Sequence, residues 1–177
     1  GDAPGMGVFK SIDGGLTWAA SNTGMGNTTV NKIVQHPSNA LVFLAATSNG
    51  IFRSVDGGNT WTNTKSGYYQ DICLKPNNPD VVYADFYRSV NNGVTFTQIT
   101  SGLTSGQRGA IAVTPANPEY VYFLQSDNSS GYKGVYRSTD GGLNFTTRST
   151  SPNILDWSCD GSGTGGQGWY DLVIAAD

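Results

Sequence analysis

The chain has 177 residues, of which only 13% are charged, and this excludes a helical bundle or coiled coil because ordinary globular proteins carry about 25%. Since 37% of the residues are hydrophobic and 11% aromatic, the chain has enough apolar surface for a core and is not a disordered tail. A net charge of −3 with ten Lys and Arg argues against electrostatic binding to nucleic acid or anionic lipid, and no apolar run approaches the ~20 residues that span a bilayer.

Four short repeats punctuate the chain. SIDGGLTW, SVDGGNTW, SVNNGVTF and STDGGLNF share the pattern Ser-x-Asp/Asn-x-Gly-x-x-aromatic. Each copy follows a strand-like run (GVFK, GIFR, DFYR or GVYR) and precedes a polar strand, which predicts a β-hairpin in which Gly supplies a positive φ and Asp accepts backbone N–H groups. The residues given this structural role are Ser11, Asp13, Gly15, Trp18, Ser54, Asp56, Gly58, Trp61, Ser89, Asn91, Gly93, Phe96, Ser138, Asp140, Gly142 and Phe145.

The other predicted elements recur in a fixed order around these octapeptides. A first strand without alternation, as at 72–74 and 111–113, is typical of a strand buried on both faces. A proline-containing turn then leads to a second strand (42–46, 81–84 and 120–124), because proline cannot continue a ladder. A third strand ends at the octapeptide, and a fourth follows it.

The spacing of the proline turns gives the period of the repeat. Pro37, Pro76 and Pro115 are 39 residues apart in both intervals, which is about the length of one four-stranded propeller blade. The sequence therefore predicts an all-β fold: a β-propeller of four-stranded antiparallel blades, with about three and a half blades of a larger ring of about seven. We expect the end of one blade at 1–29, blades at 30–67, 68–106 and 107–149, and an insertion with the first strand of the next blade (170–176) at 150–177.

The octapeptides resemble the Asp-box, or BNR, repeat of β-propellers such as sialidases, sortilin-type receptors, xyloglucan-cleaving glycoside hydrolases and secreted Bacteroidetes proteins. The resemblance extends over nearly the whole chain and implies a bacterial protein that is secreted or displayed at the cell surface. In these families the boxes lie at outer hairpins away from the binding mouth, so Asp13, Asp56 and Asp140 are assigned to the fold and not to catalysis or calcium binding. The third box departs from the pattern at Asn91 and Phe96, which predicts a weaker turn.

Residues for the common catalytic and metal sites are few. His36 is the only histidine, and Cys73 and Cys159 lie far apart along the chain, so we predict no metal and no cofactor. Two free cysteines are the favoured interpretation, and a pairing of the two stays open. Sialidase chemistry in the resembling fold needs a Tyr/Glu pair, whereas Glu119 is the only glutamate and lies in a predicted turn.

One set of residues is predicted to form a ligand site. Aligning the inner strands on Ile33, Ile72, Ile111 and Ile174 places the residues before them at one mouth of the central channel, where loops commonly bind ligands. Aromatic rings would lie there beside carboxylates, an arrangement that suits sugar rings or an extended peptide. Alternatively, the Trp and Tyr before the last strand only fill a gap between blades. The predicted residues are Tyr68, Tyr69, Asp71, Arg108, Trp169, Tyr170 and Asp171.

Three functions remain open. The favoured one is a recognition propeller that binds a glycan or protein at the channel mouth. The second is a glycoside hydrolase that uses a pair of carboxylates such as Asp71 and Asp171, and the third is an assembly or scaffold protein. An open arc of blades would leave inner-strand faces in water, so we also expect the remaining blades of the same protein, or a partner chain, to complete the ring.

Overall fold

The computed structural model describes residues 5–104, 106–170 and 172–177 of the chain. These residues form three four-stranded antiparallel sheets and one two-stranded hairpin, and they contain no helix of the length and hydrophobicity that a membrane crossing requires. The hairpin is β1 (Phe9–Lys10) and β2 (Ala19–Ala20). The first sheet is β3 (Val30–Gln35), β4 (Phe43–Thr47), β5 (Gly50–Ser54) and β6 (Thr62–Ser66); the second is β7 (Cys73–Leu74), β8 (Val82–Ala84), β9 (Tyr87–Ser89) and β10 (Thr97–Gln98); the third is β11 (Arg108–Val113), β12 (Val121–Ser126), β13 (Tyr132–Ser138) and β14 (Thr146–Ser149).

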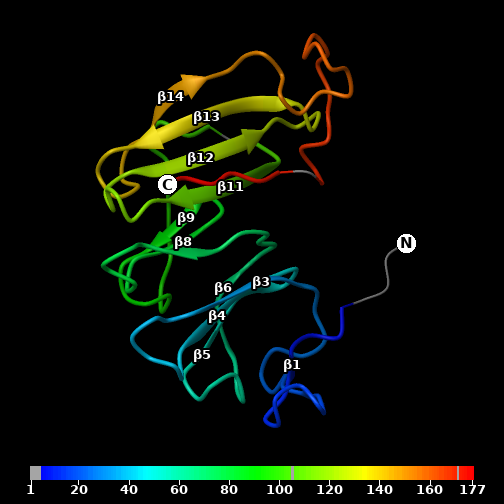
Figure 1. Ribbon diagram of the computed structural model, residues 1–177, viewed down its shortest axis with the longest axis vertical. Coiled ribbons are helices and arrows are strands. Elements are labelled where there is room, and N and C mark those ends of the chain that lie inside the picture. Colours follow the sequence, from blue (N-terminus) through cyan, green and yellow to red (C-terminus); the bar gives the residue numbers. More distant parts are fainter. Residues whose placement is uncertain (1–4, 105, 171) are drawn as a thin grey trace.

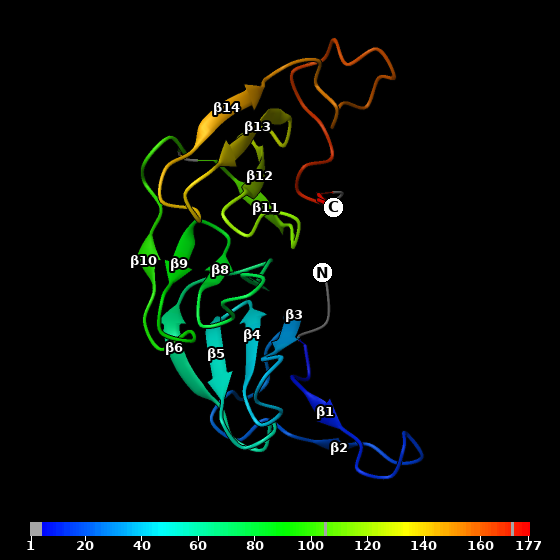
Figure 2. The same ribbon diagram turned by 60° about the vertical axis from the view of Figure 1, so that its left-hand side comes forward.

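Each sheet is a meander in which every strand pairs with the next along the chain. The three sheets follow one another in chain order (Figure 1). Figure 2 shows that they lie along an arc, with β3 and β11 on its concave side and β6, β10 and β14 on its convex side. The first strand of each sheet therefore lines the inside of the arc.

The four octapeptides form turns with the same hydrogen bonds. In the second turn, Ser54 donates its hydroxyl to Asp56 Oδ1 (2.8 Å) and accepts the N–H of Gly58 (2.9 Å), while Asp56 accepts the N–H of Thr60 (2.9 Å). Gly57 and Gly58 have φ of 73° and 83°, a region that favours glycine. The departure at Asn91 keeps this geometry: its Oδ1 accepts the N–H of Thr95 (3.0 Å), and the turn loses only a charged acceptor.

The core lies between successive sheets. Leu44 and Ile51 of the first sheet pack with Ile72, just before β7, and with Val82 of the second sheet in one cluster. A second cluster joins the second and third sheets through residues such as Tyr83 and Phe123. The interior of the molecule is thus a series of layers between facing sheets, and stacking holds neighbouring sheets together.

The last segment of the chain differs from the prediction. Residues 170–176 were expected to form a strand, yet no strand is assigned to the described residues after β14. Leu172 is nevertheless buried against Ala110 and Leu124, so the segment runs along β11 (Figure 1). The segment holds the place of an inner strand, but the described residues provide no second strand for its backbone to pair with.

Candidate ligand-binding site

The beginnings of the inner strands are linked across the sheets by polar contacts. Lys32 of β3 donates its ammonium group to Asp71 Oδ1 (2.6 Å), and the second oxygen of Asp71 accepts the N–H of Ile111 in β11 (2.8 Å). Asp71 also accepts the N–H of Ile72. Both carboxylate oxygens are therefore occupied by protein donors, and Asp71 is a structural link between three sheets.

The predicted residues near the end of the chain meet Arg108. Its Nη1 donates to the carbonyl oxygens of Trp169 (3.0 Å) and Tyr170 (2.8 Å). The two aromatic rings lie 5.4 Å apart between centroids, and 56% and 69% of these residues' surface is exposed. In the described part of the chain, both rings are therefore open to solvent. Asp171 lies outside the described residues.

A hollow of about 320 Å³ opens beside these strand beginnings and is lined by residues of all three sheets and of the segment 67–70. We call it the mouth hollow. Its lining is mostly polar backbone and side chains, with aromatic rings at several positions. The lining residues are Ser66, Gly67, Tyr68, Tyr69, Gln70, Asp85, Phe86, Tyr87, Gly106, Gln107, Arg108 and Gly109. Of the predicted residues, the structure brings Tyr68, Tyr69 and Arg108 together here.

The two neighbouring tyrosines have different environments. Tyr68 is 58% exposed, so its ring is free to contact a ligand. Tyr69 is only 4% exposed and packs edge-on against Tyr87, with centroids 5.7 Å apart. Tyr69 is therefore mainly a core residue, although its edge also lines the mouth hollow. The structural reason is that Tyr69 joins the cluster between the first two sheets.

Asp85 is the residue of the mouth hollow that sequence analysis missed. Its carboxylate is buried and accepts the backbone N–H groups of Gln70 and Asp71, both at 3.0 Å. Burial raises the pKa of Asp85 to about 7, although these two hydrogen bonds oppose the rise. A carboxyl group with this pKa is partly protonated near neutral pH, so it can donate as well as accept a hydrogen bond.

The sequence does contain a signal for Asp85. The β8–β9 hairpin is four residues shorter than the β4–β5 hairpin when the two are aligned on their paired residues. In that alignment Asp85 takes the place of Ala46 in the first sheet and Leu124 in the third, which are both buried apolar residues. A carboxylate at a repeat position where the other blades have buried apolar residues indicates that this position does not serve only the core. Asp85 also has a φ of 43°, which Asp tolerates better than most residues.

A second, smaller hollow lies on the other side of Arg108. It measures about 220 Å³ and is lined by residues of β3 and β11, by Gln70 and Asp71, and by the last segment. Asp71 and Lys32 border it, so the ion pair between them forms part of its wall. The six predicted residues that the structure describes are thus divided between the two hollows and the exposed pair at 169 and 170.

The described residues hold no group of three or more His, Cys, Asp or Glu side chains placed to bind a metal ion. Cys73 and Cys159 are both free, so the pairing left open by the sequence does not form. Burial raises the pKa of the Cys73 thiol to about 12, which makes it unreactive.

Comparison with known proteins identifies the architecture. No protein-family model and no curated protein matches the chain. Among solved structures, a GH74 enzyme from Niastella koreensis is 22% identical with a TM-score of 0.70, over 90% of this chain and 29% of that one. An ancestral GH74 enzyme is 22% identical with a TM-score of 0.68, over 85% of this chain and 22% of that one. The sheets are blades of a β-propeller.

The predicted all-β propeller fold is therefore confirmed. A GH74 xyloglucanase from Xanthomonas campestris superposes with a TM-score of 0.62 at 15% identity, over 82% of this chain and 27% of that one. The chain spans less than a third of each of these proteins. The three four-stranded sheets are three blades.

Proposed function

We propose that the chain is part of a bacterial propeller, secreted or displayed at the cell surface, that recognises a glycan at the mouth hollow. The observation that supports this is the exposed ring of Tyr68 at the edge of a polar hollow of about 320 Å³. Sugar rings stack their apolar faces on aromatic side chains, while their hydroxyls need donors and acceptors. Gln70, Asp85 and Arg108 line the same hollow and supply both.

The structural neighbours favour a glycan over a protein as the proposed ligand. These neighbours are GH74 enzymes, and one of them is a xyloglucanase. Xyloglucan oligosaccharides are therefore the first probes to use. Soluble β-linked glucan oligosaccharides without side branches provide the comparison.

The binding experiment is a calorimetric titration of each oligosaccharide into the wild-type chain and its variants. We expect Tyr68→Ala to weaken binding about tenfold, equivalent to about 1.4 kcal/mol, without lowering the melting temperature. Leu143→Ala is the matched control, because Leu143 is an exposed apolar residue in an octapeptide turn, away from the mouth hollow. If Tyr68→Ala binds as tightly as the wild type, the mouth hollow is not the site.

A hydrolase is the second candidate, and one observation favours it. Asp85 has the raised pKa that a general acid needs near neutral pH. The predicted partner Asp71 uses both of its oxygens on protein donors, so it is a poor base or nucleophile. Release of reducing ends in the same titration mixtures, abolished by Asp85→Asn, would favour the hydrolase over the recognition protein.

A further inference from the structure

The mouth hollow continues into a second hollow at the junction of the second and third blades. This outer hollow measures about 270 Å³ and shares Phe86, Tyr87 and Gly106 with the lining of the mouth hollow. It adds residues of the strand β10 and of the linker that follows it. The two hollows therefore form one groove that leads from the strand beginnings toward the convex side of the arc, where β10 lies (Figure 2).

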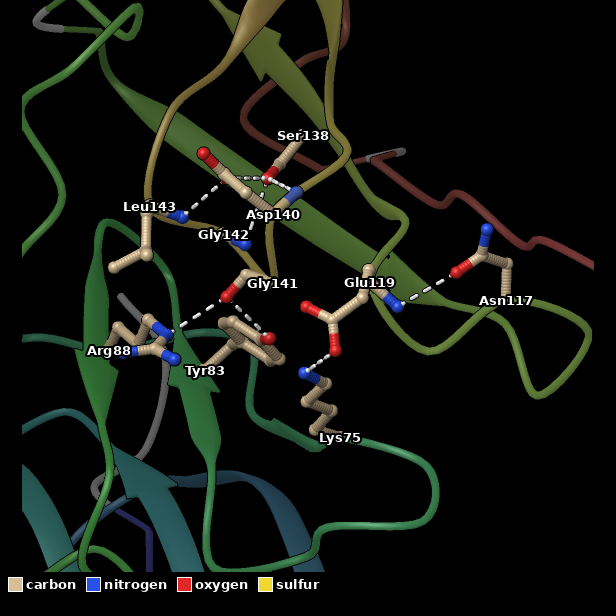
Figure 3. Close-up of polar contacts among 10 residues, drawn as sticks. All are labelled: Lys75, Tyr83, Arg88, Asn117, Glu119, Ser138, Asp140, Gly141, Gly142 and Leu143. Carbon is tan, nitrogen blue, oxygen red and sulfur yellow. Dashed lines mark hydrogen bonds and ion pairs between the residues drawn. The ribbon is translucent and has the colours of Figure 1, made fainter.

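The groove lies within the arc and not at one of its ends. Both neighbours of the second blade are part of the chain. At the octapeptide end of the same junction, Arg88 Nε and Tyr83 Oη donate to the carbonyl of Gly141 (2.9 and 2.8 Å; Figure 3). Lys75 and Glu119 form an ion pair beside them. The groove thus opens between two blades that these polar contacts hold together.

Short elements in the second blade account for the opening. The outer strand β10 has two residues, whereas β6 has five and β14 has four. The β8–β9 hairpin is short as well, and Phe86 and Tyr87 at its end stay partly exposed. A blade that departs from the repeat in this way indicates a function that its neighbours do not share.

The outer hollow combines an apolar floor with a polar rim. Ile99 and Leu103 are only 7% and 8% exposed and belong to the core cluster between the second and third sheets. Phe86 packs on the same cluster, with its ring centroid 5.0 Å from that of Phe123. The rim offers one amide and two hydroxyl groups on exposed residues, which are Gln98, Thr100 and Thr104.

The lining also differs from the mouth hollow in charge. Asp85 and Arg108 line the mouth hollow, whereas the residues that line the outer hollow, all of them in the described part of the chain, carry no formal charge. Lys65 lies nearby, but its ammonium group contacts the Tyr87 ring, 4.7 Å from the centroid. A carboxylate buried in the outer hollow would lose its hydration without gaining a cationic partner. The lining therefore favours an uncharged ligand.

We propose that the outer hollow is a further subsite of the glycan site and takes neutral sugar units of a chain whose adjoining units occupy the mouth hollow. Apolar faces of the sugar rings pack on Phe86 and Tyr87, and the rim binds their hydroxyls. The ligand class is thus a neutral polysaccharide chain that spans both hollows, not a single terminal sugar. This inference rests on the proposed function, because the mouth hollow has to bind a glycan first.

Calorimetric titration with oligosaccharides of increasing length tests the proposal. The neutral probes are xyloglucan oligosaccharides and unbranched β-linked glucan oligosaccharides, each with a short and a long backbone. Oligogalacturonides of the same lengths carry a carboxylate on every unit and provide the acidic comparison. We expect lengthening to raise the affinity for the neutral chain that binds at least about tenfold, and to leave that for the acidic chain unchanged.

A variant of the outer hollow shows where this gain arises. Thr100→Met fills the hollow with a side chain that offers no ring and no hydroxyl, so the gain with length should disappear while the short probe binds as before. Thr62→Met is the matched control, since Thr62 is an exposed residue of β6 in the first blade and lines neither hollow. An unchanged melting temperature of both variants shows that the fold is intact.

The outcomes separate this inference from the proposed function. Equal affinity of the wild type for short and long neutral probes, or a full gain with length in Thr100→Met, would overturn the outer subsite while the proposal for the mouth hollow stands. Absence of binding to every neutral probe would overturn both.

Discussion

At the scale of single residues, the carboxylates of this chain fall into two opposite groups. The turn residue Asp56 accepts the hydroxyl and N–H of Thr60, and these hydrogen bonds lower its pKa to about 2. The pKa of Asp85 is raised to about 7 because that carboxyl is buried. The turns therefore lose stability only as the pH falls below about 4, whereas the titration of Asp85 changes the stability of the fold at higher pH.

The pH dependence of unfolding follows from Asp85. Its pKa in the folded chain exceeds the ordinary value of 3.8, so the folded state binds the additional proton between these values. The free energy of unfolding should decrease as the pH rises from about 4 to about 7, by an amount on the order of 4 kcal/mol.

Urea unfolding at several pH values checks this prediction. In Asp85→Asn the dependence over that range should disappear, and Asn is the suitable replacement because it also tolerates a positive φ. The same slope in the wild type and in Asp85→Asn would show that another group titrates.

At the scale of elements, the octapeptide turn is the unit that the sequence predicts best. Its Ser, Asp and Gly make their hydrogen bonds within eight residues, so the geometry does not depend on the rest of the fold. The burial of its closing aromatic residue is different, because a neighbouring segment supplies the cover. Trp61 donates its indole N–H to the carbonyl of Ser21 (2.9 Å), which lies after the preceding hairpin.

Two tryptophans at the same turn position provide a matched pair of variants. Trp61→Ala should lower the free energy of unfolding by roughly 3–5 kcal/mol, since it leaves a large cavity. Trp18→Ala should change it by less than about 0.5 kcal/mol in the dilute chain, as for most surface substitutions. Equal losses in urea unfolding at low micromolar concentration would contradict this difference in burial.

At the scale of the whole molecule, the repeat period could be predicted from the sequence, whereas only some residues of the mouth hollow could be. Proline spacing and the four octapeptides locate three sheets because every blade repeats them. Tyr69 looked like a ligand residue because its burial depends on Tyr87 of another strand. Asp85 was missed because its environment arises from a shortened hairpin, and the strand expected at 170–176 needs a pairing partner from beyond the blade.

The whole molecule is expected to fold without a metal ion. The carboxylates of Asp13, Asp56 and Asp140 already accept hydroxyl and N–H groups of their own turns. A calcium ion needs 6–8 oxygen ligands, and these turns offer no such set. Addition of EDTA should leave the melting temperature unchanged within about 1 °C, and a decrease of several degrees would reveal a structural cation.

The shortened β8–β9 hairpin has a consequence for how such a molecule diversifies. At the octapeptide ends the blades are joined by carbonyl contacts, and a Cβ added to Gly93 or Gly142 would clash with Leu44 or Tyr83 of the neighbouring blade. The hairpins at the opposite ends vary: aligned on their paired residues, the β8–β9 hairpin is four residues shorter than β4–β5 and the β12–β13 hairpin longer. Insertions and deletions at that rim can therefore reshape the hollow proposed as the glycan site while the framework of blades stays constant.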